Sequence, residues 1–229
     1  MKQFLIISAS RSNTDTEVSL ARSLEDMKKY NVTTQDHQVI LQLDNKEGLS
    51  KIYNQYLNTK YLNKYEGIIF VHDDVYIDDI KFLEKIKNQF RKGFSVVGLA
   101  GASAAKIGKP ALWHLMSDRK DYAGAVDHPH SENVSYTTAF GPTPKRCLIM
   151  DGLFLAINCK KFKKTPVKFD EQFNFHHYDL DFCLQCNSKG HKLTTTNINV
   201  LHSSPGLLNI NSPSYQKSEE LFLNKYVKN

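Results

Sequence analysis

The chain has 229 residues, of which 41% are hydrophobic and 24% charged, with 11 glycines and 7 prolines. This composition is typical of a soluble globular protein and excludes a disordered or fibrous one. Thirty basic and 24 acidic residues give a net charge of +6, which favours an acidic partner such as nucleotide phosphates, nucleic acid or an anionic membrane face. At this length we expect one domain, spanning residues 1–229, because two full domains would be cramped.

The apolar segments of the sequence are all short. The run at 4–7 is too short for the core of a signal peptide, and the stretches at 67–71 and 94–105 fall well below the roughly 20 residues of a membrane span. We therefore expect a cytoplasmic protein, with the inner face of the membrane as a second location. Four cysteines do not make a disulfide scaffold in a chain of this size, so we expect reduced thiols.

The first hundred residues alternate between strand and helix patterns. Continuous apolar runs predict strands, and apolar residues at helical spacing predict helices. In chain order we expect strands at 4–7, 37–43, 65–71 and 94–100, separated by helices at 16–30, 48–61 and 78–90. This order predicts an α/β fold with a mostly parallel central sheet flanked by helices, in which ligands bind beyond the carboxyl ends of the strands.

The second half of the chain has weaker periodicity. Residues 101–146 exceed the length of an ordinary loop, so we expect a long active-site insertion there. A strand at 147–158, a helix at 178–189 that ends before Gly190, a strand at 193–201 and a helical tail from 212 follow. We divide the domain into a nucleotide-binding half (1–100), an acceptor and catalytic half (101–206) and a C-terminal helical tail (207–229).

The third predicted strand runs directly into two adjacent carboxylates, Asp73 and Asp74. Such neighbours repel each other unless they are solvated, capped or bound to a cation, and hard oxygen ligands favour Mg²⁺ or Mn²⁺, which bridge diphosphates. From this segment alone, a turn or a helix cap is the alternative.

Aromatic residues alternate with acids and two histidines at 169–184. Asp179 lies at the start of the predicted helix, where the helix dipole keeps a carboxylate ionised, as a general base or a metal ligand requires. A plain N-terminal cap by Asp179 or Asp181 fits this pattern equally well. His202 ends the last strand, but no Cys/His spacing indicates structural zinc. We expect Cys183 and Cys186 to pack in the core.

Several functional classes lack their motifs. The sequence has no G-x-x-x-x-G-K-[ST], G-x-G-x-x-G or G-x-S-x-G element, which argues against a P-loop NTPase, a dinucleotide-binding oxidoreductase and an α/β hydrolase. Basic residues are scattered except at 160–164, which we interpret as a solvated turn, so we expect no nucleic-acid partner.

Read in chain order, the motifs resemble the nucleotide-sugar glycosyltransferases of the GT-A fold, in particular a family-2-like branch that includes a streptomycin-biosynthesis-type transferase. The resembling elements are 53–54, HDD with its flanks at 70–75, 97–101, Trp113, DGLF at 151–154, FDE at 169–171, HYDLD at 177–181, Gly190 and HSS at 202–204. Together they cover about 150 residues, and their order makes the set more specific than any single element.

The resemblance implies a D-x-D-like site at 72–74, in which Asp74 binds Mn²⁺ or Mg²⁺ on the donor diphosphate and His72 replaces the first aspartate. It also implies His202 as a late metal or diphosphate ligand, Asp179 as the acid that deprotonates the acceptor hydroxyl, and Asp181 as its neighbour in a catalytic role. The remaining implied positions are Ser8, Asn45, Asn54 and Asp73 for the nucleotide. For the acceptor we expect Trp113 and Asp151; a core tryptophan and a turn aspartate are the alternatives.

We therefore expect a metal-dependent, inverting glycosyltransferase that moves a sugar from a nucleoside-diphosphate sugar to a hydroxyl on a glycan or a lipid-linked acceptor. Assembly of a cell-surface polysaccharide or glycoconjugate is the expected setting, with peripheral membrane association, and the oligomeric state is left open. Two alternatives are a non-catalytic nucleotide-sugar-binding scaffold, since His72 replaces an acid, and a divalent-metal nucleotidyltransferase.

Overall fold

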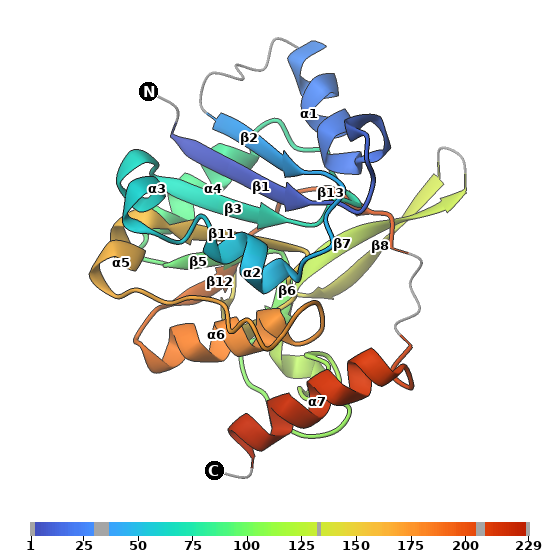
Figure 1. Ribbon diagram of the computed structural model, residues 1–229, viewed down its shortest axis with the longest axis vertical. Coiled ribbons are helices and arrows are strands. Elements are labelled where there is room, and N and C mark those ends of the chain that lie inside the picture. Colours follow the sequence, from blue (N-terminus) through green and yellow to red (C-terminus); the bar gives the residue numbers. More distant parts are fainter. Residues whose placement is uncertain (1–2, 30–36, 132–133, 205–208, 228–229) are drawn as a thin grey trace.

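The computed structural model describes residues 3–29, 37–131, 134–204 and 209–227, and its strands form two sheets (Figure 1). The larger sheet has seven strands in the order β2-β1-β3-β11-β5-β12-β9. Their bounds are β1 Phe4–Ala9, β2 His37–Gln42, β3 Gly67–Val71, β5 Val96–Gly98, β9 Arg146–Cys147, β11 Phe154–Asn158 and β12 Leu193–Thr195. This confirms the predicted α/β architecture with a central sheet.

The direction of the strands changes across this sheet. β1 pairs in parallel with β2 and β3, and β12 pairs in parallel with β5. β11 lies between β3 and β5 and is antiparallel to both. The apolar run at 147–158 therefore supplies a central strand of reversed direction, preceded by the short β9 and β10 (Ile149–Met150).

Helices pack against both sheets. They are α1 Ser19–Lys29, α2 Leu49–Asn54, α3 Thr59–Lys64, α4 Phe82–Arg91, α5 Cys159–Lys164 and α6 Tyr178–Ser188, with short 3₁₀ turns η1 Asp15–Glu17 and η3 Arg119–Asp121. The predicted helix at 48–61 is two helices, because the Asn58 side chain accepts hydrogen bonds from the backbone N–H groups of Lys60 and Tyr61 and so starts α3. The predicted turn at 160–164 is instead the helix α5.

The second sheet has the order β10-β6-β7-β13-β4, with β8 paired to β7. Its further bounds are β4 Val75–Ile77, β6 Ala100–Ala102, β7 Tyr122–Ser131, β8 Val134–Gly141 and β13 Val200–His202. The predicted loop-like insertion at 101–146 thus contains the hairpin β7–β8. β8 is exposed along most of its length, so it carries no apolar alternation that would have indicated a strand. The apolar stretches at 94–100 and 193–201 each divide between the two sheets.

One hydrophobic core extends from β1 to α7 (Pro213–Tyr226) and includes both sheets. Phe222 anchors α7 in this core, and Cys183 and Cys186 are fully buried free thiols, which confirms their predicted packing role. None of the helices in the described part combines the length and apolar character that crossing a bilayer requires.

Candidate functional site

The site is built where β3 and β13 end. Residues 72–74 follow β3 directly, and His202 is the last residue of β13. β13 pairs antiparallel with β4 so that His202 lies opposite Val75, and the Ser203 N–H donates to the Asp74 carbonyl at 2.9 Å. This register brings together two parts of the chain that are far apart in sequence.

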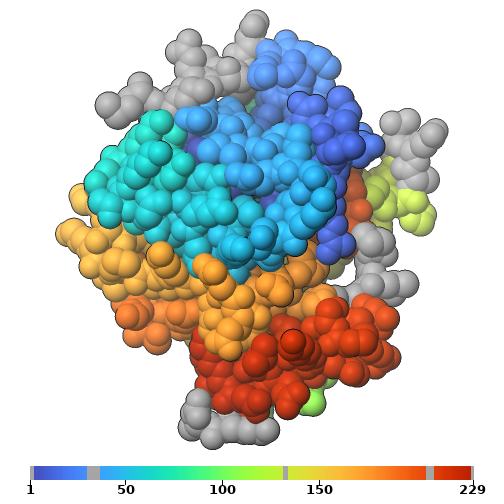
Figure 2. Space-filling model, in the orientation of Figure 1, coloured from blue at the N-terminus to red at the C-terminus, as the bar shows by residue number. Residues whose placement is uncertain are grey.

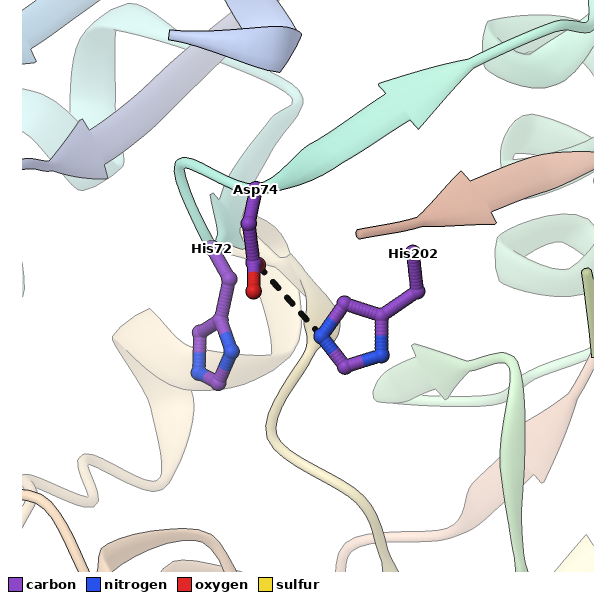
Figure 3. Close-up of side chains that lie close together, drawn as sticks. All are labelled: His72, Asp74 and His202. Atoms are coloured by element: carbon purple, nitrogen blue, oxygen red, sulfur yellow. Dashed lines mark ion pairs between the residues drawn. The ribbon is translucent and has the colours of Figure 1, made fainter. Parts of the chain in front are cut away.

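Three side chains converge at this point (Figure 3). One ligand atom from each of His72, Asp74 and His202 lies within 4.8 Å of the others. His202 Nε2 is 3.4 Å from Asp74 Oδ1, a buried oxygen that has no hydrogen-bond partner among the described residues. A buried carboxylate oxygen without a donor is costly, and a cation held by two imidazoles and this carboxylate would satisfy it. These residues therefore fit a divalent metal.

The pKa values of the three side chains in this cluster depend on their burial and on the charges of their neighbours. Burial opposes ionisation of Asp74, but the adjacent rings of His202 and His72 outweigh it, and the pKa of Asp74 lies below its usual value. Burial likewise opposes protonation of His202, yet the Asp74 carboxylate raises the pKa of that ring. Burial lowers the pKa of His72. The cluster thus contains an ionised carboxylate beside one ring that is readily protonated and one that stays neutral.

A hydrogen-bond chain fixes the tautomer of His72. The Tyr178 hydroxyl donates its only proton to the Gly152 carbonyl at 2.9 Å, because a carbonyl can only accept. His72 Nε2 lies 2.8 Å from the same hydroxyl oxygen, so Nε2 carries the ring proton and donates it. The lone pair of the neutral ring is then on Nδ1.

A pair of carboxylates, Asp151 and Asp179, lies beside the cluster. Asp179 accepts hydrogen bonds from the backbone N–H groups of Gly152 at 2.8 Å and Leu180 at 2.9 Å. Burial and the negative charge of Asp151 nevertheless raise the pKa of Asp179 to about 7. Asp151 is itself held by the Trp113 indole N–H at 3.1 Å. The arrangement gives Asp179 a pKa close to neutrality, as a general base requires.

Two cavities near this site share one lining residue, Phe175. One, of about 440 Å³, is lined by His72, Trp113, Asp151 and Asp179, together with Phe175 and other residues. The other, of about 640 Å³, is lined by residues of the loops after β1, β2 and β3, including Arg11, Asn45 and Asp73, and again by Phe175. The Phe175 ring stacks on His72 with centroids 6.0 Å apart, and the residue is 53% exposed. Phe175 therefore stands between the two cavities.

Three predicted residues, Asn54, Ser8 and Asp181, lie neither in the metal cluster nor in the lining of these cavities. Asn54 is buried, and its side-chain amide forms hydrogen bonds with the backbone of Phe169 and with the carboxylate of Glu171. Ser8 is buried in β1, and its hydroxyl has no hydrogen-bond partner in the described part of the chain.

Asp181, predicted as a catalytic neighbour of Asp179, is fully buried. It bonds to Gln185, to the Lys225 ammonium at 2.6 Å and to the Tyr226 hydroxyl at 2.7 Å. Its contacts attach α7 to α6, and it faces away from the cavity that Asp179 lines.

Sequence reasoning missed Arg11, Phe175 and Tyr178 as site residues. Arg11 lies in the polar loop after the first predicted strand, where ligands are expected, and that position was the available signal. Phe175 and Tyr178 belong to the aromatic segment at 169–184, but nothing in its pattern separates exposed rings from buried ones.

Comparisons with known proteins identify the family and the fold. The model of a glycosyltransferase-like family matches residues 10–226. The catalytic domain of Drosophila beta1,4-galactosyltransferase 7 in complex with xylobiose is similar in structure, with a TM-score of 0.52 and 10% identity over 93% of this chain and 79% of that one. A mutant of that enzyme in complex with manganese, UDP-Gal and xylobiose is also similar, with a TM-score of 0.50 and 10% identity over 90% of this chain and 77% of that one.

A protein from STIV is also similar, with a TM-score of 0.51 and 14% identity over 87% of this chain and 85% of that one. No curated protein matches the chain. The solved structures, at such low identity, establish the fold, and the family match extends over almost the whole sequence. The chain therefore belongs to this glycosyltransferase-like family and is a glycosyltransferase of the GT-A fold.

Proposed function

We propose that this glycosyltransferase is metal-dependent and transfers a sugar, with inversion, from a nucleoside-diphosphate sugar to a hydroxyl of a glycan acceptor. The observation that carries the proposal is the placement of the His72–Asp74–His202 cluster beside two cavities that share Phe175. A donor in one cavity and an acceptor in the other would meet at this cluster. UDP-Gal, manganese and xylobiose are bound in a structural relative, which supports the same division of labour here.

The donor is assigned to the cavity lined by Arg11, Asn45 and Asp73. Arg11 supplies a charged fork that can pair with phosphate oxygens. The Asn45 side chain is bonded to the backbone of Glu47, which holds the loop after β2 in a tight turn along the cavity wall. Asp73 is a candidate acceptor for the hydroxyls of a ribose.

The metal is assigned to His72, Asp74 and His202. Two imidazoles and one carboxylate favour Mn²⁺ over Mg²⁺, because Mg²⁺ strongly prefers oxygen ligands. When bound, such an ion neutralises charge on the departing diphosphate. The chain's own contribution is to hold the three ligands in register through the β4–β13 pairing and to keep Asp74 ionised.

Asp179 is the proposed general base. Its two backbone hydrogen bonds orient the carboxylate, and its raised pKa makes it a competent proton acceptor near neutral pH. Because the base takes the proton from the attacking hydroxyl on the side opposite the leaving diphosphate, a single displacement inverts the anomeric carbon.

The acceptor is assigned to the cavity between Trp113 and Phe175. Trp113 is 6% exposed, and its indole N–H donates a hydrogen bond to the Asp151 carboxylate. Trp113 therefore positions Asp151, and Asp151 can orient an acceptor hydroxyl. The exposed ring of Phe175 offers an apolar face against which a sugar can stack. Cell-surface polysaccharide or glycoconjugate assembly, and placement in the streptomycin-biosynthesis-type branch, are proposals that rest on the sequence motifs.

A donor screen followed by two variants tests this function. UDP-, GDP-, CMP- and dTDP-sugars are added with and without Mn²⁺, and stabilisation against heat identifies the donor, after which release of nucleoside diphosphate is measured. Asp74→Ala should abolish Mn²⁺-dependent release, whereas Asp118→Ala, at an acid with 76% side-chain exposure, should not. Release that survives Asp74→Ala and Asp179→Asn would refute the site. Pyrophosphate as product would indicate a nucleotidyltransferase, and donor binding without turnover would indicate a scaffold.

A further inference from the structure

The chain's positive charge is concentrated at the end of the large sheet that lies opposite the site. Four segments at this end, 59–66, 91–95, 159–168 and 188–192, contain ten lysines, one arginine and a single acid, Glu66. The remainder of the chain has 19 basic and 23 acidic residues and is therefore net negative. The site does not account for the +6 charge: Arg11 and Lys46 in the donor cavity are balanced there by Glu47 and Asp73.

The sheet topology brings these four segments together. Three of the segments come directly before the strands β3, β5 and β12, which run in the same direction. The fourth comes directly after β11, which runs in the opposite direction. All four segments therefore lie at the same end of the sheet. Backbone hydrogen bonds join them: Cys159 N–H to the Glu66 carbonyl at 3.0 Å and Ser95 N–H to the Lys192 carbonyl at 2.7 Å. The His191 ring adds a bond to the Thr165 carbonyl at 2.8 Å. Figure 2 shows α3 (cyan) directly against α5 (amber) at this end of the sheet.

The eleven basic side chains of this basic end are exposed. Four of them, Lys161, Lys164, Lys189 and Lys192, line one cavity of about 330 Å³. Within the described ranges these four form no ion pair with a carboxylate. Like charges gathered without counter-charges repel one another, so the arrangement fits an external polyanion.

The chemistry of the basic end favours a membrane surface over nucleic acid. Ten of the eleven groups are lysines, which act as mobile point charges, whereas planar groups such as the arginine fork are better suited to bidentate recognition of base edges. None of the large exposed apolar residues of the described chain lies in these segments, so there is no aromatic platform for stacking bases and no apolar wedge for deep insertion. Lysine clusters of this kind adsorb to anionic headgroups.

We propose that the basic end docks the protein on an anionic lipid surface, with phosphate headgroups seated among Lys161, Lys164, Lys189 and Lys192. This goes beyond the proposed transfer reaction, since none of these residues lies in the site. β3 has five residues and spans about 17 Å, so the site lies on the order of that distance from the basic end. This orientation presents the site to acceptor hydroxyls that project away from the headgroups.

Vesicle binding by the full chain tests the proposal. Binding is measured by flotation with vesicles of phosphatidylcholine alone and with added phosphatidylglycerol. The test variant changes Lys161, Lys164, Lys189 and Lys192 to Gln. The control variant changes four exposed lysines elsewhere, Lys28, Lys29, Lys51 and Lys120, to Gln and therefore has the same net charge. Melting temperatures of both variants verify folding.

We expect binding only with phosphatidylglycerol, lost as salt shortens the Debye length from about 10 Å at 0.1 M to about 3 Å at 1 M. The test variant should bind on the order of a thousandfold more weakly than the control variant, since each lysine near an anionic surface contributes about 1 kcal/mol. Equal binding by the two variants, or no preference for phosphatidylglycerol, would overturn the proposal. Tighter binding of a single-stranded oligonucleotide than of vesicles would also overturn it and would assign the basic end to nucleic acid.

Discussion

The two ends of the large sheet carry charge in opposite ways. At the site, three acids have defined neighbours: the Asp74 carboxylate lies 3.4 Å from His202 Nε2, Asp151 accepts from the Trp113 indole N–H, and Asp179 accepts from two backbone N–H groups. At the basic end, eleven exposed basic groups are accompanied by a single acid, Glu66. A partly buried carboxylate with a neighbouring group has a defined geometry and a shifted pKa, and both are needed for catalysis. Exposed charges of one sign instead attract a ligand of opposite charge over a distance set by the salt concentration. A net charge of +6 therefore describes the surface of this protein and not its site.

The largest expected effect is at the base. Asp179→Asn removes the proton acceptor and should lower the turnover rate by about 10²- to 10⁴-fold. The expected pH dependence follows from the raised pKa of about 7: only the ionised carboxylate accepts a proton, so the rate of the natural protein should fall roughly tenfold per pH unit below about pH 7 and level off above it.

Rate against pH for the natural protein and the Asn variant checks this prediction. The variant should lose the acidic limb while still binding Mn²⁺, because Asp179 is not among the cluster ligands. A variant that keeps the same acidic limb would show that another group titrates. The four-lysine variant of the basic end serves as the matched comparison, since its pH profile should be unchanged.

The sequence predicted the parts of the fold that depend on local pattern. β1, β2 and β3 follow from apolar runs, α1 and α4 follow from apolar residues at helical spacing, and the position of His72 and Asp74 follows from a strand end. The split of the 94–100 stretch into β5 and β6 could not be predicted, because a continuous apolar run does not specify which sheet buries it. The exposed hairpin β7–β8 lacks such a pattern altogether.

The same distinction applies to the site residues. His202 and Asp74 meet because of the β4–β13 register, and the sequence could suggest this only through family resemblance. Asp179 and Asp181 are indistinguishable by pattern, yet one lines a cavity and the other binds Lys225 of α7. Tertiary partners that are distant in sequence decided the roles of both acids.

A smaller effect is expected from Tyr178, which positions His72. Tyr178→Phe removes the acceptor for His72 Nε2–H, so the ring no longer holds its lone pair on Nδ1, and Mn²⁺ affinity should fall about 10- to 100-fold. Tyr53→Phe is the control, because it also removes one hydroxyl from a fully buried tyrosine, and its ring lies 6.0 Å from that of Tyr178.

Two measurements separate positioning from simple loss of packing. Titration calorimetry gives Mn²⁺ affinity, and NMR of ¹⁵N-labelled histidine gives the tautomer. The metal-free natural protein should show His72 as the Nε2–H form, and Tyr178→Phe should show a mixture. The positioning role would be refuted by an Nδ1–H form in the natural protein, or by equal affinities for the Tyr178 and Tyr53 variants.

The smallest expected effect on activity is at Asp181, which marks where the site stops. Asp181→Asn keeps the shape of the side chain but weakens its bonds to Lys225 and Tyr226, and Lys225 retains its second partner, Asp170, at 2.6 Å. The free energy of unfolding should fall by about 1–3 kcal/mol, measured by urea denaturation, while turnover at temperatures well below melting stays unchanged. If Asp181→Asn instead lost as much turnover as Asp179→Asn while remaining folded, Asp181 would belong to the catalytic machinery, and the site would extend through α6 to α7.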